Sequence, residues 1–161
     1  MNTRDGNGAD VTIRPATERD FPVLPALAAR LTAFELPPWR TAAEIADADT
    51  AAMVEAVRAG SADNEVSIAE RRGTPVGCLH MMAPIDFFGR RHAHISVIAT
   101  SEDAEGTGVG RALVAYAEAW ARRRNLALLT LNVFDANAHA RRFYERGGFT
   151  PEVIKYVKPL W

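Results

Sequence analysis

The sequence predicts a mixed α/β fold in which helices cover both faces of one mixed β-sheet. Alternating segments at 66–69 and 76–82 flank a turn at Gly73 and therefore predict an antiparallel hairpin. A β-rich segment at 92–100, helical spacing at 110–124 and an apolar run at 126–134 predict a crossover unit with two parallel strands. The full order of elements is β-α-α-β-β-β-α-β-α-β, so both strand directions occur in one sheet.

The N-terminal elements follow from local patterns. Alternation at 11–14 predicts a short first strand, and apolar residues at helical spacing predict a helix over about 17–32. Consecutive prolines require a loop at 34–39, because proline has no backbone N–H to donate. A second helix is predicted over about 42–59, where a glycine at the next position ends it.

The C-terminal third predicts one more helix and a final pair of strands. The run at 126–134 is apolar without clean alternation, which indicates a central strand covered on both faces. Asn137 can cap a short helix that ends at Gly147 and Gly148. A last strand pair is expected from Phe149 to Leu160.

Length and charge limit the classes of function. The 161 residues fit one domain over 10–161, and the polar segment 1–9 is expected to be a disordered tail, because it lacks the apolar stretch of a signal peptide. Nineteen Lys and Arg balance 20 Asp and Glu, so we expect neither a nucleic acid nor a membrane as partner. No apolar run approaches the length of a membrane span, and a cytoplasmic location is expected.

Cysteine and histidine usage argues against a metal centre. Cys78 is the single cysteine, so an intramolecular disulfide and a multi-cysteine zinc site are both excluded. The four histidines do not follow a known ligand spacing. No metal is therefore expected, and Cys78 is interpreted as a small core residue.

A glycine-rich segment at 105–110 lies between a predicted strand and a predicted helix. The first turn of a helix presents unpaired N–H groups and a partial positive charge, which favour a bound phosphate. A P-loop is excluded because Arg111 and not Lys follows Gly110, and a G-x-G-x-x-G dinucleotide pattern fails because Arg111 occupies its last glycine position. A coenzyme A pyrophosphate pattern, Gln/Arg-x-x-Gly-x-Gly/Ala, is matched by Gly108 and Gly110 but not by Glu105. A plain tight turn remains the alternative.

The next helix carries a second candidate segment. Asn137 and Tyr144 are two helical turns apart and share a face, with the small Ala140 between them. An amide and a phenol along a groove floored by alanine suit a thin ligand such as the pantetheine arm of coenzyme A. The structural alternative is an N-cap asparagine and a buried tyrosine.

Together these two segments resemble the GNAT superfamily of N-acetyltransferases. The segments Ile13-Arg14-Pro15 and Gly73-x-Pro75-Val76-Gly77 are also similar to the family, so that the resemblance covers nearly the whole domain. It implies a mostly antiparallel twisted sheet of about six to seven strands with helices on both faces. It also implies acetyl-coenzyme A as co-substrate and direct acetyl transfer to a primary amine on a small molecule or peptide. A homodimer remains open.

The resemblance implies a role for each matching position. The backbone of the 92–100 strand would pair with the pantetheine arm, the glycine turn would bind the pyrophosphate, and Tyr144 would lie near the sulfur and protonate the leaving thiolate. Glu105 is repulsive toward a pyrophosphate, so Arg111, Arg141 or Arg142 is expected to compensate. The implied cofactor-binding residues are Ile98, Thr100, Glu105, Gly106, Thr107, Gly108, Val109, Gly110, Arg111, Asn137 and Tyr144.

The general base is the least determined part of the site. His94 is the first candidate, because alternation places it on one strand face with Ile98 and Thr100 and because histidine titrates near neutral pH. An exposed or structurally bonded histidine is the alternative reading, and His92 is a weaker candidate. Two loop carboxylates, Glu35 and Asp86, could act through water. Since the strand has no acidic residue, a non-catalytic coenzyme A-binding module remains the alternative function.

Overall fold

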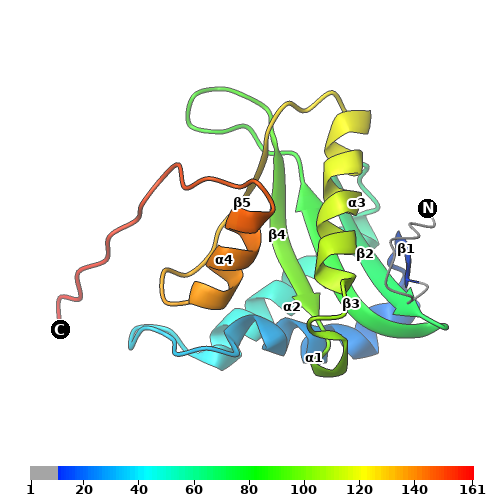
Figure 1. Cartoon of the computed structure of the whole chain (residues 1–161), viewed down its shortest axis with the longest axis horizontal. Coiled ribbons are helices and arrows are strands. Elements are labelled where there is room, and N and C mark those ends of the chain that lie inside the picture. Colours follow the sequence, from blue (N-terminus) through cyan, green and yellow to red (C-terminus); the bar gives the residue numbers. More distant parts are fainter. Residues whose placement is uncertain (1–10) are drawn as a thin grey trace.

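The computed structural model describes residues 11–161 and contains a five-stranded mixed sheet with helices on both faces (Figure 1). The expected tail at 1–9 lies outside the described residues. Strands follow one another in chain order across the sheet, and neighbours are antiparallel except for the parallel pair β4–β5. The strands are β1 (Val11–Pro15), β2 (Asn64–Arg71), β3 (Thr74–Met82), β4 (Ala93–Thr100) and β5 (Leu129–Leu131).

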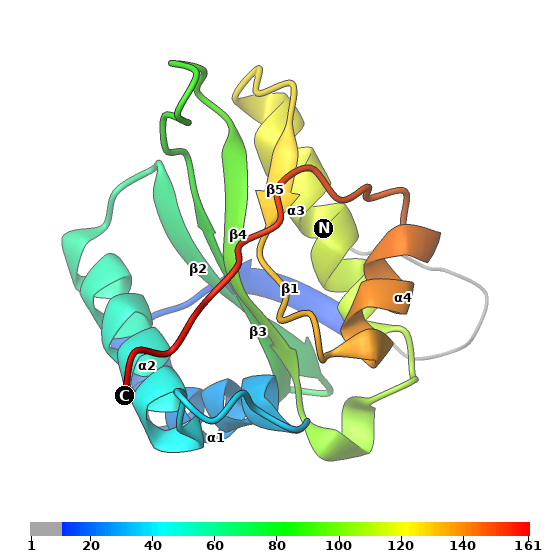
Figure 2. The ribbon, with the colours of Figure 1, turned by 90° about the vertical axis from the view of Figure 1, so that its left-hand side faces the viewer.

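Helices lie on the two faces of this sheet, with α1 and α2 on one side and α3 and α4 on the other (Figure 2). The predicted fold class is therefore confirmed. The first predicted helix is instead three short pieces, since proline residues interrupt regular bonding there. The elements are η1 (Glu18–Val23), α1 (Leu24–Ala29), η2 (Arg30–Thr32), α2 (Ala42–Ala59), η3 (Glu102–Ala104), α3 (Val109–Arg123) and α4 (Ala138–Arg146).

Two separate apolar clusters fix the helices to the sheet. Trp120 of α3 is fully buried in the first cluster, and its indole N–H donates to Glu65 of β2 at 3.1 Å. Met53 of α2 is fully buried in the second cluster, against the opposite face. Gly77 allows α3 to approach the sheet, because a Cβ there would lie 3.2 Å from the side chains of Val109 and Leu113 of α3.

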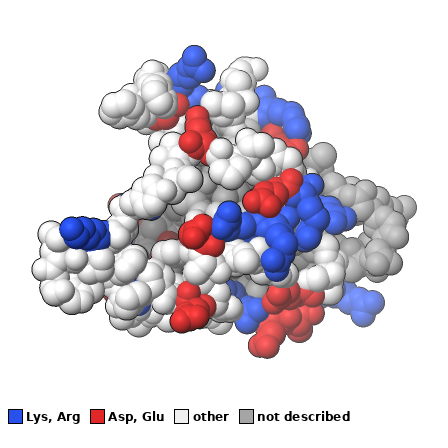
Figure 3. All heavy atoms as spheres, turned by 60° about the vertical axis from the view of Figure 1, so that its left-hand side comes forward, with Lys and Arg blue, Asp and Glu red and all other residues white. Residues whose placement is uncertain are grey.

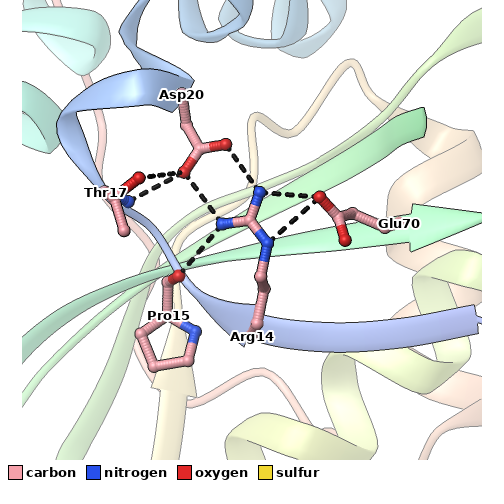
Figure 4. Close-up of polar contacts among 5 residues, drawn as sticks. All are labelled: Arg14, Pro15, Thr17, Asp20 and Glu70. Carbon is pink, nitrogen blue, oxygen red and sulfur yellow. Dashed lines mark hydrogen bonds and ion pairs between the residues drawn. The ribbon is translucent and has the colours of Figure 1, made fainter. Parts of the chain in front are cut away.

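Arg14 joins the first strand to the segment that leads into α1 (Figure 4). Its guanidinium donates to the Asp20 carboxylate at 2.8 and 2.9 Å and to Glu70 of β2 at 2.6 and 3.0 Å. Asp20 also accepts the backbone N–H of Thr17 at 2.8 Å. The hydrogen bonds from Arg14 hold the pKa of Asp20 below its usual value. This network fixes β1 to β2 and to the segment that leads into α1.

A β-bulge in β4 corrects the expected position of His94. His80 pairs with Val97 and Met81 pairs with Ile95, which leaves Ser96 without a partner on β3. The extra residue reverses the alternation: Ile95 belongs to the cluster under α3, whereas Val97 belongs to the cluster under α1 and α2. His94 therefore faces the α1–α2 side, opposite to Ile98 and Thr100, and the prediction that they share a face was wrong.

The C-terminal end also differs from the prediction. Instead of a strand pair, residues 150–161 form an extended segment without secondary structure that leaves the body of the protein (Figure 1). We call this segment the C-terminal arm. The described sheet consequently has five strands and not six to seven, and β5 has three residues where 126–134 was expected.

Candidate active site

The glycine turn leads from η3 into α3 and is exposed to solvent. Gly106 and Gly108 have φ values of +73° and +91°, which side-chain-bearing residues rarely adopt. A Cβ on either glycine would meet no atom within 4 Å, so the space above the turn is open. Val109 begins α3, whose first N–H groups have no acceptor within the helix. The backbone N–H groups at the start of α3 are thus accessible from solvent on the side of the turn.

Two arginines from other parts of the fold hold this turn. Arg30 of η2 donates to Glu105 at 2.8 Å, and Arg71 of β2 donates to the Thr107 hydroxyl at 2.8 Å. The negative charge of Glu105 is therefore compensated by Arg30, and not by Arg111, Arg141 or Arg142 as expected. Arg141 is instead bonded to Asp135 at 2.7 Å.

The end of β4, the turn and α4 meet at Gly110. A Cβ there would lie 3.5 Å from the Phe143 ring of α4 and 4.0 Å from the Thr100 methyl group. On its other edge, β4 pairs with β5 only from Ala93 to Ile95. The two parallel strands separate beyond that point, which leaves the stretch that contains Thr100 without a β5 partner.

Asn137 and Tyr144 have different environments on α4. The Asn137 side chain accepts the N–H of Ala140 at 3.1 Å and caps the helix, as in the structural alternative, which leaves its amide NH₂ for a ligand. Tyr144 lies between the rings of Phe143 and Phe149 at 5.3 and 5.7 Å. Burial raises the pKa of Tyr144 to about 12.

A pocket between α3 and α4 connects Tyr144 with the start of α3. Basic side chains gather on this face (Figure 3), and arginines from both helices contribute to the pocket. An anionic ligand bound at the glycine turn would meet positive charge in this direction. The lining residues are Arg111, Val114, Phe143, Tyr144, Arg146, Gly147 and Phe149.

His94 is half-buried on the opposite face. Its Nδ1 lies 2.8 Å from the Thr130 hydroxyl of β5, and its ring is 6.3 Å from that of His92. Burial, and to a smaller extent His92, lowers the pKa of His94, so the imidazole is neutral at pH 7. Because the Thr130 hydroxyl donates to the Ala93 carbonyl at 3.3 Å, we assign Nδ1–H as the donor to Thr130, which leaves Nε2 to accept a proton.

A third histidine, which the sequence interpretation left unassigned, lies near this pair. His80 of β3 is 1% exposed and its Nε2–H donates to Asn64 at 2.6 Å. Its Nδ1 is buried without a hydrogen-bond partner. Burial first, and then His94, lowers the pKa of His80 to about 4. The local sequence signal for His80 was its position in the alternating segment 76–82.

Three further residues were weighed as a base or a nucleophile: Asp86, Glu35 and Cys78. Asp86 accepts the backbone N–H groups of Phe88 and Arg90 at 2.9 and 2.8 Å, and thereby shapes its own loop. Glu35 is exposed. Cys78 is fully buried and burial raises the pKa of its thiol to about 12, so it is not a thiolate at neutral pH.

Neither a metal cluster nor a membrane helix is found in the described part of the chain. Among residues 11–161, no three His, Cys, Asp or Glu side chains are placed to hold a metal ion. Over the same range, every helix is too short or too polar to cross a bilayer.

Comparison with known proteins gives one family and several similar structures. The model of the Acetyltransferase (GNAT) family matches residues 26–149. A 5-NmdU N-acetyltransferase of Pseudomonas phage PaMx11 is 43% identical over 53 residues, which span 33% of this chain and 36% of that protein. The alignment thus covers about a third of the curated relative.

Solved structures agree over nearly the full length. A transcriptional regulator from Bacillus halodurans C-125 has a TM-score of 0.69 and 27% identity, and the match covers 92% of this chain and 99% of that one. An aminoglycoside N-acetyltransferase in complex with CoA has a TM-score of 0.70 and 18% identity, with 94% and 96% covered. At such identities the likeness shows the fold.

Proposed function

Because the chain belongs to the GNAT family of acetyltransferases, we propose that it transfers the acetyl group of acetyl-coenzyme A to a primary amine. The observation that carries this proposal is the open glycine turn at the start of α3, next to a separated β4–β5 edge. A structural neighbour bound to CoA supports the choice of co-substrate.

The proposal assigns coenzyme A to residues on the α3 side of the sheet. Backbone N–H groups from Gly106 to Arg111 bind the pyrophosphate, as helix N-termini bind other phosphates. The β4 backbone at Ile98 and Thr100 pairs with the pantetheine arm along the edge that β5 leaves free. The Asn137 amide NH₂ donates to the same arm.

The acceptor amine approaches from the other face in this scheme. An alkylammonium with a pKa near 10.4 has only about a thousandth of its population neutral at pH 7.4, so the amine must lose a proton before attack. His94 accepts that proton, directly or through water, since its imidazole is neutral at pH 7. The amine nitrogen then attacks the thioester carbonyl and the C–S bond breaks. The proton that the attacking nitrogen must still lose passes, directly or through water, to the leaving thiolate, so that an amide and a free thiol form without an acyl-enzyme.

Charge develops at two atoms during this transfer. The carbonyl oxygen becomes an oxyanion, and a backbone N–H of β4 near the unpaired Ser96 is the group proposed to stabilise it. The leaving thiolate resembles that of cysteine, with a pKa near 8.5. Because the Tyr144 phenol has a pKa of about 12, it stabilises the thiolate by donating a hydrogen bond while it keeps its proton.

A coenzyme A-binding module without catalytic activity is the second candidate function. The absence of an acidic residue from β4 favours it, since His94 is then the main base left on that strand. Both functions use the same turn, so coenzyme A binding cannot distinguish them and turnover must be measured.

The test mixes the purified protein with acetyl-coenzyme A and a panel of amines, and follows the release of free thiol. The panel includes 5-NmdU and an aminoglycoside, because two similar proteins are named as N-acetyltransferases of these compounds. Amine-dependent release that falls in Tyr144→Phe supports the transferase. Binding in calorimetry without turnover for any amine supports the module, and absence of binding contradicts both.

A further inference from the structure

The loop between β3 and β4 carries a group of exposed apolar side chains. Ile85, Phe87 and Phe88 have exposed fractions of 71%, 97% and 75%, and we call these three residues the aromatic tip. The two phenyl rings meet edge to face, with their centroids 5.5 Å apart. Large apolar side chains gain free energy when they leave water, and adjacent exposed ones therefore mark a contact surface.

Hydrogen bonds within the loop fix the shape of this tip. The N–H of Asp86 bonds the Arg90 carbonyl at 2.8 Å, and the N–H of Gly89 bonds the Asp86 carbonyl at 3.0 Å. The Asp86 carboxylate accepts the N–H groups of Phe88 and Arg90 at 2.9 and 2.8 Å. These four backbone donors are paired inside the loop, so the tip can leave water without exposing them unpaired to an apolar phase.

Positive charge gathers at the base of the tip. Arg90 is exposed, whereas Asp86 turns its carboxylate toward the loop backbone. Arg91 and Arg124 share one carboxylate, since both form ion pairs with Asp63. Three arginines therefore face two carboxylates in a loop that projects beyond the start of β4 (Figure 1).

We propose that the aromatic tip inserts into the surface of an anionic lipid membrane, with the arginines at its base against the headgroups. Apolar side chains at the end of the loop and cations beneath them follow the order of hydrocarbon and headgroup in a bilayer. The balanced charge of the whole chain predicts no membrane as partner, so the binding depends on this loop alone. It is therefore weak and reversible.

The size and shape of the tip favour a membrane over a protein partner. Three large apolar side chains provide roughly 500 Å² of surface, whereas a stable protein interface covers about 800 Å² on each partner. A projecting loop also requires a matching hollow on a protein, while a fluid bilayer adapts to its shape. Phenylalanine side chains of peripheral proteins lie at the boundary of headgroups and acyl chains, which a projecting tip can reach.

Sedimentation with lipid vesicles tests the insertion. The vesicles contain phosphatidylcholine alone or an equal mixture with phosphatidylglycerol. Phe87→Ser/Phe88→Ser should lower the partition coefficient on the mixed vesicles at least tenfold. The matched control is Tyr156→Ser/Trp161→Ser, which removes two arm side chains that are 89% and 87% exposed and should keep binding within about twofold. An equal loss in both variants means general adhesion of exposed apolar groups and overturns the proposal.

Absence of binding by the unmodified protein also overturns it. If light scattering then shows self-association that Phe87→Ser/Phe88→Ser abolishes, the tip contacts a second copy of the chain instead of a membrane. None of these measurements depends on acetyl transfer.

The arginines at the base supply a separate test of charge. Arg90→Gln should weaken binding to the mixed vesicles about fivefold, because one cation at an anionic surface is worth about 1 kcal/mol. The same variant should bind neutral vesicles as the unmodified protein does. Since only the backbone of Arg90 bonds within the loop, its shape should persist. An equal change on both kinds of vesicle would contradict the contact with headgroups.

A fluorescent label reports which end of the molecule enters the lipid. An environment-sensitive probe on Phe87→Cys should shift to the blue with mixed vesicles, and spin labels on the acyl chains should quench it. The same probe on Thr74→Cys, at the other end of β3, should show neither change. Cys78 is fully buried with a thiol pKa of about 12, so it does not take up the label. Equal signals at both positions would overturn the insertion of the tip.

Discussion

Arg30 donates a hydrogen bond to Glu105 across 75 positions of the sequence, with 2.8 Å between Nη2 and Oε2. The pair lies at the glycine turn, where Glu105 replaces the Gln or Arg of the coenzyme A pattern. Arg30 therefore neutralises the carboxylate that would otherwise repel a pyrophosphate.

This pairing predicts a dependence of coenzyme A binding on both residues. Arg30→Ala should weaken acetyl-coenzyme A binding up to about fivefold, because an exposed ion pair is worth at most about 1 kcal/mol. In a Glu105→Gln background, the same change should have little effect, since no carboxylate is left unpaired. Calorimetry of the four proteins measures the coupling. An equal loss in both backgrounds would show that Arg30 contacts the ligand directly.

Tyr144 gives a prediction about turnover. Removal of its hydroxyl in Tyr144→Phe should lower kcat about tenfold to a hundredfold with little change in KM, because the lost hydrogen bond forms to a charged thiolate. The matched control is Tyr156→Phe in the exposed arm, which should keep full activity. Unchanged turnover in Tyr144→Phe would remove this phenol from the mechanism.

His94 gives a prediction about pH. The neutral imidazole is the proposed base, and burial lowers its pKa below 6.5, so kcat/KM should stay constant near pH 7 and fall below pH 6.5 as the ring gains a proton. His94→Gln should lower kcat/KM about a hundredfold or more and abolish this acid limb. His139→Gln should keep the acid limb; because the His139 ring lies 3.8 Å from Glu105, the pH dependence of this variant and not its absolute kcat/KM serves as control. An acid limb that persists in His94→Gln would assign it to another group.

Local chemistry explains which elements the sequence predicted well. α2 begins and ends where expected because its signals are local: the Thr41 side chain accepts the N–H of Glu44, and Gly60 adopts a φ of +62°. Asn137 caps α4 for the same reason. The glycine turn was also located correctly, since its glycines and the following apolar helix are adjacent in sequence.

The errors arose where structure depends on distant partners. One unpaired residue at Ser96 has no distinct sequence signature, yet it moves His94 to the other face of the sheet. The contact of Arg30 with Glu105 exists only in the tertiary fold. The segment after Phe149 has strand-forming residues, but propensity alone cannot supply the neighbouring strand that a β-strand requires.

His80 predicts how stability depends on pH. Burial lowers its pKa from 6.5 to about 4 in the folded protein, so the unfolded chain binds more protons between these values. The free energy of unfolding should therefore be constant above pH 6.5 and decrease as the pH falls toward 4, by about 3 kcal/mol in total from this residue. Asp20, whose pKa is lowered from 3.8, acts only at still lower pH.

Denaturant unfolding at several pH values between 4 and 7 measures this dependence. His80→Gln should be less stable at pH 7 because the buried site is altered, but its stability should change less between pH 6.5 and 4 than that of the unmodified protein. His139→Gln, which removes an exposed ring, should keep the full slope. Since the comparison uses slopes and not absolute stabilities, the packing cost of the substitution cancels. Parallel curves for all three proteins would show that His80 keeps its usual pKa in the fold.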